Sequence, residues 1–112
     1  MKPGDILLVH IPVTVGSTKL RPALLLARLP GPYQNLLVCG VSTQTRQLES
    51  DWDEMIGRAD PDFRESGLHQ PSAIRLSYLY AAERSQILGR IGSVSKGRLD
   101  RLRTRLADHL KP

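Results

Sequence analysis

Apolar residues along the chain gather in short runs that turn-forming residues separate. Each run is of strand length and rich in Val, Ile and Leu, which favours buried β-strands over helices. Pro12 is expected to end the first run, and the small polar residues of 13–20 are expected to form a loop. The predicted strands of this kind are residues 6–11, 22–28, 36–41 and 87–91.

Residues 72–80 form a further predicted strand in which side chains alternate between two faces. Ile74, Leu76, Tyr78 and Tyr80 make the more apolar set, so this face is predicted to turn to the core. The opposite face carries Ala73, Arg75, Ser77 and Leu79.

Residues 43–70 differ in composition, because they carry over half of the acidic side chains and few apolar ones. Long loops with a short strand around residues 52–56 are predicted here. Trp52 is expected either to pack on the core or to serve as an interface or base-stacking aromatic.

Residues 95–110 carry the pattern of an amphipathic helix. Ser95 suits the N-cap position, and leucines follow at helical spacing at 99, 102, 106 and 110. The other face carries Arg98, Arg101, Arg103 and Arg105, which the sequence leaves as either a solvated face or a face for RNA or another partner.

Short strands followed by one helix predict a mainly β protein: a small, strongly curved antiparallel sheet or barrel that a C-terminal helix caps. The length of 112 residues predicts a single domain over residues 1–112. A hydrophobic fraction of 40% excludes wholesale disorder. No apolar run approaches membrane-spanning length, so a cytoplasmic protein without a membrane partner is expected.

Charge adds a preference for anionic partners, since 16 Lys and Arg against 11 Asp and Glu give a net charge of +5. Cys39 is the one cysteine and is expected to be a core residue. His10, His69 and His109 are scattered, so no metal site is predicted and each histidine is expected to be structural or solvated.

The remaining polar candidates lie where strands begin or end. Arg21 precedes Pro22 at the start of one strand, and Ser42, Thr43 and Gln44 follow another. A guanidinium can bind a phosphate through two hydrogen bonds, and a hydroxyl can bond a further oxygen. On residue types alone this pair is a weak indication of phosphodiester chemistry.

Taken in order, these segments resemble the MazF/PemK toxins of prokaryotic toxin–antitoxin systems. Each element is degenerate, but the ordered set is fairly specific and covers nearly the whole chain. The elements are Gly4-Asp5 with its apolar strand, Gly16-Ser17, Arg21-Pro22 with its strand, Val41-Ser42-Thr43-Gln44, Gly67-Leu68, Pro71-Ser72, Ile91-Gly92 and the leucine-striped helix.

The resemblance implies a small SH3-like antiparallel barrel of the CcdB/MazF type with a C-terminal helix. It also implies a homodimeric, metal-independent and cofactor-free endoribonuclease that cuts single-stranded RNA sequence-selectively by attack of the ribose 2′-OH and so inhibits translation and growth. A cognate antitoxin with an acidic tail would neutralise it by crossing the RNA groove.

By the same resemblance, Arg21 and Ser42 correspond to the catalytic pair, with Ser42 in place of the usual Thr. Substrate binding is implied for Gly16, Ser17, Thr18, Lys19, Thr43 and Gln44. Many relatives carry Glu where this chain has Thr18, which leaves the general base unassigned. His10, where relatives often carry Asp, is one substitute for it.

Two other functions remain open on the sequence. One is an inactive or regulatory member that binds RNA or antitoxin without cutting. The other is a gyrase-directed poison like CcdB, which shares the fold and does not need Arg21 and Ser42.

Overall fold

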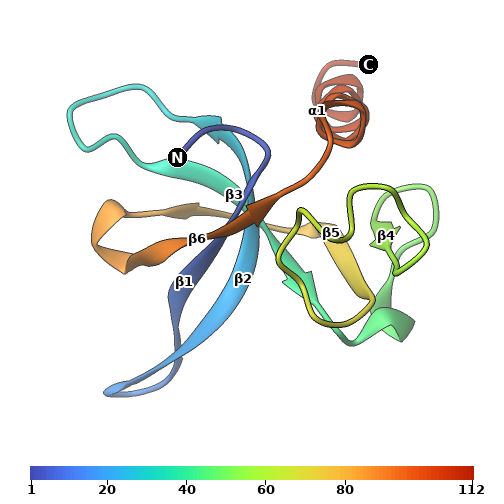
Figure 1. Cartoon of the computed structure of the whole chain (residues 1–112). Coiled ribbons are helices and arrows are strands. Elements are labelled where there is room, and N and C mark those ends of the chain that lie inside the picture. The colour runs from blue at the N-terminus through green and yellow to red at the C-terminus, as the bar shows by residue number, and fades with distance from the viewer.

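The computed structural model describes all 112 residues as one curled antiparallel sheet with a helix at the C-terminal end (Figure 1). Two 3₁₀ turns, Thr45–Gln47 and Arg84–Gln86, join the elements. The strands and the helix are β1 (Asp5–Thr14), β2 (Ser17–Arg28), β3 (Leu36–Ser42), β4 (Glu54–Ile56), β5 (Ser72–Ala82), β6 (Ile87–Ser93) and α1 (Lys96–Leu110).

The strand order β4-β5-β3-β2-β1-β6 makes a six-stranded half-barrel, and every neighbouring pair is antiparallel. The prediction of a small mainly β fold with a C-terminal helix is therefore confirmed. The predicted strands at 36–41 and 87–91 and the short strand near residue 54 are also present.

The prediction that Pro12 ends the first strand, and that residues 13–20 form a loop, is wrong. Strands β1 and β2 continue as a long hairpin to a turn at residues 15–16, with Pro12 opposite Thr18. In Figure 1 this hairpin projects from the body of the sheet. The pairing of β1 with β6 already ends at Val9, so Pro12 lies where β1 has only one neighbour, and a proline is tolerated on such an edge.

Alternating side chains of β1, β2 and β3 build two apolar clusters, one on each face of the sheet. Ile6, Leu24 and Cys39 face the cluster that includes α1, whereas Leu7, Leu25 and Val38 face the second cluster. Both faces of these central strands are buried, which explains why their sequences are continuous apolar runs.

Strand β5 contains an insertion that changes which of its side chains face the core. Gly40 pairs with Arg75 but the preceding residue, Cys39, pairs with Leu79, so residues 76–78 bulge out of the ladder. The bulge breaks the alternation. Ile74 and Leu76 are buried as predicted, but Tyr78 is 46% exposed and Tyr80 packs on the second cluster, so the prediction of one continuous core face is wrong.

Helix α1 begins and packs as predicted. The Ser95 hydroxyl accepts a hydrogen bond from the Arg98 backbone N–H at 3.2 Å, which caps the helix. Leu99, Leu102 and Leu106 are buried in the first cluster, while Leu110 is 73% exposed.

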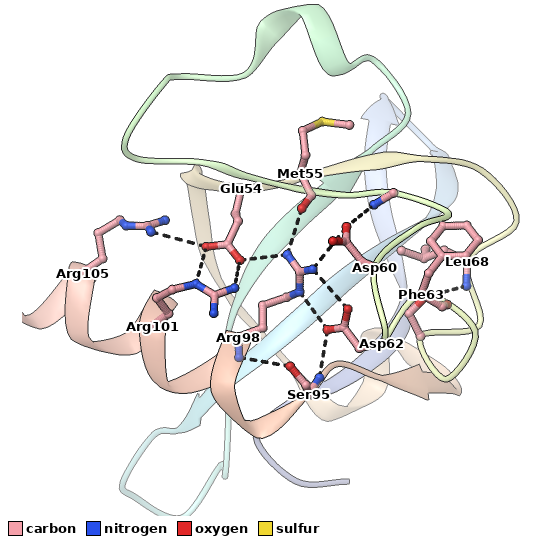
Figure 2. Close-up of polar contacts among 12 residues, drawn as sticks. Glu54, Met55, Asp60, Asp62, Phe63, Leu68, Ser95, Arg98, Arg101 and Arg105 are labelled. Atoms are coloured by element: carbon pink, nitrogen blue, oxygen red, sulfur yellow. Dashed lines mark hydrogen bonds and ion pairs between the residues drawn. The ribbon is translucent and has the colours of Figure 1, made fainter.

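The arginines of α1 do not form the free cationic face that the sequence left open. Arg98 is only 5% exposed and lies between Asp62 and Glu54 (Figure 2). Its Nε and Nη1 donate to these two carboxylates at 2.8 Å each, and Nη1 also donates to the Met55 carbonyl. Arg101 and Arg105 also pair with Glu54. The acid-rich residues 43–70, called the acidic segment below, thus neutralise three arginines of the helix.

Residue Asp62 is the second centre of this ion-pair cluster, because it also accepts a hydrogen bond from the Ser95 backbone N–H at 3.0 Å. Burial by itself raises the pKa of Asp62, but the hydrogen bonds from Arg98 and Ser95 and the charge of Arg98 outweigh it. The pKa of Asp62 is therefore held below its usual range. A carboxylate of this kind stabilises the fold above its unfolded-state pKa, and the stabilisation is lost as pH falls through the lower folded-state value.

Replacing Arg98 with Ala should lower the free energy of unfolding by about 3–5 kcal/mol, because it leaves the buried carboxylate of Asp62 without its charged partner. Arg103→Ala is the matched control: Arg103 lies on the same helix, is exposed and forms no ion pair, and its loss should change stability by less than about 0.5 kcal/mol. Urea unfolding at pH 7 measures both. Equal stability of the two variants would contradict the account. The difference between wild type and Arg98→Ala should shrink as Asp62 is protonated at acid pH.

Candidate functional site

A groove of about 760 Å³ lies on the sheet, and its lining includes Ile11 and Tyr80, which pack on the second cluster, and Leu68 and Ile91, which pack on the first. Strands β1, β2, β3 and β5 and the loop that precedes β5 all contribute to its lining. The volume is in the range of ligand-binding clefts. Gly40 of β3 lies in its floor, where a Cβ would lie 3.5 Å from the Tyr78 ring.

The structure brings Arg21 and Ser42 into this groove together. Pairing of β2 with β3 ends at Ala23 opposite Gly40, and the same register continued by two residues sets Arg21 opposite Ser42. Residues opposite each other in antiparallel strands point to the same face. The two side chains that the sequence singled out from separate strand ends therefore share one wall.

Both side chains have free hydrogen-bonding capacity. Arg21 is exposed and forms no ion pair within the chain, so its whole guanidinium is available to an anion. The Ser42 hydroxyl accepts the Gln44 backbone N–H at 3.1 Å, which leaves its own proton free to donate.

The other predicted binding residues divide into two groups. Thr43 and Gln44 line the groove beside Ser42. Gly16, Ser17, Thr18 and Lys19 lie at the exposed end of the β1–β2 hairpin and are not among the lining residues. In this hairpin, residues 11–13 of β1 line the groove. A role in substrate binding for the four residues at the end of the hairpin therefore stays a prediction.

The sequence reasoning missed His69, which lines the groove together with Gln70. Two glycines bring their loop to this place. A Cβ on Gly67 would lie 2.1 Å from the Ile91 carbonyl oxygen, and a Cβ on Gly92 would lie 2.3 Å from the Glu65 carbonyl oxygen. Only glycines allow the loop to approach β6 this closely. The signal was present, since His69 stands between the Gly67-Leu68 and Pro71-Ser72 elements.

His10, the substitute base considered from the sequence, does not line the groove. It pairs with Leu20 in the hairpin, one residue further along β1 than the pairing of Val9 with Arg21. The His109 ring packs 4.9 Å from the Trp52 ring, and Trp52 packs on the first cluster, so both side chains have structural contacts on the helix side.

Three further side chains of β5 line the groove: Arg75, Tyr78 and Tyr80. Arg75 is held loosely, with its Nε 3.8 Å from Asp53 and its Nη atoms 3.4 Å from Gln47 and Ser77. No local sequence pattern predicts this arrangement, because it depends on the bulge at residues 76–78.

The charged side chains that line the groove are both arginines. Two guanidiniums line it, Arg21 and Arg75, and no carboxylate does. Arg75 lies 3.8 Å from Asp53, so Arg21 is the guanidinium of the lining that has no ion-pair partner within the chain. Such a lining favours an anionic ligand.

Two groups with shifted pKa values are excluded as nucleophiles or bases near neutral pH. Burial raises the pKa of Cys39 to about 12, and its side chain faces the helix-side cluster, as the sequence predicted for a core residue. Burial, with a smaller effect from Tyr78, raises the pKa of Tyr80 to about 12, so this phenol stays protonated.

No three His, Cys, Asp or Glu side chains lie close enough together to hold a metal ion. None of the helices combines the length and the apolar character needed to cross a bilayer.

Fold and groove together define a class: a small curled β-sheet protein with a C-terminal helix and an open cationic groove with an Arg and a hydroxyl on one wall. The sequence pattern of the PemK-like, MazF-like toxins of type II toxin–antitoxin systems matches residues 2–110. The chain belongs to this toxin family, as the ordered motifs indicated. Comparison with individual curated proteins gave no significant match. A type II toxin acts with a protein antitoxin, so membership implies such a partner.

Proposed function

We propose that this protein is a toxin that cleaves single-stranded RNA, with Arg21 and Ser42 acting on the scissile phosphate. The observation that carries the proposal is the groove itself: its lining contains Arg21 without an ion pair, the Ser42 hydroxyl with its proton free to donate, a second guanidinium and no carboxylate. A polyanion is the ligand that such a lining favours. Of the three functions left open by the sequence, RNA cleavage is the one that uses this pair.

The proposed reaction is attack of a ribose 2′-oxygen on the adjacent phosphorus. The 2′-O–P bond forms, the bond from phosphorus to the 5′-oxygen breaks, and the products are a 2′,3′-cyclic phosphate and a 5′-hydroxyl. Arg21 would stabilise the negative charge that grows on the phosphorane, and the free proton of Ser42 would bond a non-bridging oxygen.

This reaction needs a group that removes the 2′-hydroxyl proton, and His69 is the residue we assign to it. Carboxylates are absent from the lining, and arginine and protonated tyrosine are poor bases near neutral pH. Imidazole is the side chain best suited to exchange a proton in this range. Arg21 and Arg75 face the groove with His69, and Arg58 donates to the His69 carbonyl at 2.9 Å, which helps to fix the loop.

The same groove offers a means of neutralisation. An acidic antitoxin tail laid along it would meet Arg21 and Arg75 and compete with RNA for them. We also propose that the protein acts as a two-fold homodimer, as the resemblance implies. In this account, RNA and the antitoxin compete for the groove and not for helix α1.

Arg21→Ala should reduce RNA cleavage by about 10²–10³-fold or more, because it removes the donor that stabilises the transition-state charge. The measurement is the cleavage rate of a long, weakly structured RNA, with and without EDTA. Chelation should not alter the rate. Arg103→Ala is the control, since it also removes one exposed arginine but lies on α1. Cleavage by Arg21→Ala at the wild-type rate would refute the assignment, and complete inhibition by EDTA would indicate a metal nuclease.

His69→Gln should lower the cleavage rate by about 10²–10⁴-fold and should change the shape of the pH–rate profile, because it removes the proposed proton acceptor. Thermal stability should change little, because the His69 side chain is exposed. His10→Gln is the matched control and should keep the wild-type profile. If His69→Gln retains that profile, the proton acceptor is another group.

A further inference from the structure

We propose that Tyr78 and Tyr80 form a nucleobase-binding subsite for a nucleotide next to the scissile phosphate. This inference rests on the proposed function, because it assigns a second part of the same groove to the same class of ligand. The subsite adds selectivity for a base, whereas Arg21 and Ser42 act on the backbone that every RNA shares.

Tyr78 reaches the groove only because β5 bulges. Asp53, itself 5% exposed, accepts hydrogen bonds from the Ser77 backbone N–H at 3.0 Å and from the Ser77 hydroxyl at 2.8 Å. This buried carboxylate fixes the bulge at its centre. Bulges commonly redirect a side chain beside a functional site. Here the result is an aromatic ring that stays 46% exposed in the lining of a cleft.

The ring of Tyr78 lies over the floor of the groove. A Cβ built on Gly40 would lie 3.5 Å from Tyr78 Cγ, so the ring covers the gap that this glycine leaves. Tyr80 stands beside it, with the two ring centres 5.4 Å apart and the planes at 71°. This edge-to-face contact holds Tyr78 from one side and leaves part of its surface open to a ligand.

Tyr80 supplies the polar part of the subsite. Its hydroxyl oxygen is buried and has no hydrogen-bond partner in the chain, although Tyr80 lines the groove. A buried polar atom without a partner is costly, and such an atom beside a binding cleft is readily satisfied by a ligand. Base edges carry donors and acceptors, so one of them can pair with this hydroxyl.

The position of the tyrosines relative to the catalytic pair suits a neighbouring nucleotide. Tyr80 pairs with Val38 and Arg75 pairs with Gly40, while Ser42 lies further along the same strand. At about 3.4 Å per residue, the row of Tyr80 lies about 14 Å from that of Ser42 along β3. Arg75 falls between the two, where it can contact the connecting phosphate.

The test measures binding of single-stranded RNA oligonucleotides that carry 2′-deoxyribose at the mapped cleavage position, so that they bind without being cut. Each position in turn is replaced by an abasic nucleotide, and affinity is measured by fluorescence anisotropy. Tyr78→Ala, Tyr78→Phe and Tyr80→Phe are compared with wild type. Tyr33→Ala is the matched control, because Tyr33 is exposed in the turn between β2 and β3 and does not line the groove.

Tyr78→Ala should weaken binding by roughly tenfold or more, and Tyr78→Phe and Tyr33→Ala should not. The loss should vanish when one particular nucleotide beside the cleavage position is abasic, since no base is left to stack. Tyr80→Phe should reduce the preference for one base at that position. Wild-type affinity in Tyr78→Ala would overturn the subsite, as would a loss that is the same at every abasic position.

Two further outcomes distinguish a failure of this inference from a failure of the proposed function. If the wild-type protein does not cut RNA, the proposed function fails, and the same scan on unmodified single-stranded RNA still tests the subsite. If Tyr78→Ala weakens only the binding of an acidic antitoxin peptide and leaves RNA affinity unchanged, the tyrosines serve the protein partner and the nucleobase assignment is wrong.

Discussion

The buried guanidinium of Arg98 holds helix α1 against the acidic segment that forms one side of the molecule. Its bonds to Asp62, Glu54 and the Met55 carbonyl link residues far apart in the chain. Breaking such a buried pair is strongly destabilising, because it leaves a charge in a poorly solvated place. These contacts act together with the apolar packing of Trp52, Ile56 and Phe63 on the first cluster to hold the segment in place.

The restraint on the acidic segment extends to the groove through two contacts. Asp53, next to Glu54, fixes the bulge in β5 by binding Ser77. Further along, the loop after Asp62 packs on β6 at Gly67 and Gly92, and this packing carries His69 to the lining. The helix arginines therefore support the site indirectly, by holding the loops that shape it, and Arg21 and Arg75 are the cations that face the ligand.

Much of the fold and part of the site could be predicted from the sequence. Apolar runs marked the central strands, and the Ser95 cap with its leucine stripe marked the helix, because both signals are local. Arg21 and Ser42 were identified from ordered motifs, and the structure brings them to one groove. The continuation of β1 past Pro12 could not be predicted, because it depends on where β6 stops pairing.

The helix arginines and the side chains of β5 differ from their sequence-based predictions for the same physical reason. A helical arginine face looks solvated or ligand-binding in sequence, and only the fold shows that Glu54 and Asp62 lie opposite it. Likewise, the alternation of residues 72–80 gave a wrong face for Tyr78 and Tyr80, since a three-residue insertion in the ladder leaves no local signal. Both outcomes depend on contacts between segments far apart in the chain, and a local sequence pattern carries no information on such contacts.

The most direct test of the central claim is cleavage of an RNA oligonucleotide with a single 2′-deoxyribose at its mapped cleavage position. If the groove uses the ribose 2′-OH as nucleophile, this substrate should still bind but should not be cut there, and the parent RNA should yield a 5′-hydroxyl and a cyclic phosphate. Cutting of the deoxy substrate at the parental rate, or products with 5′-phosphates, would contradict the account.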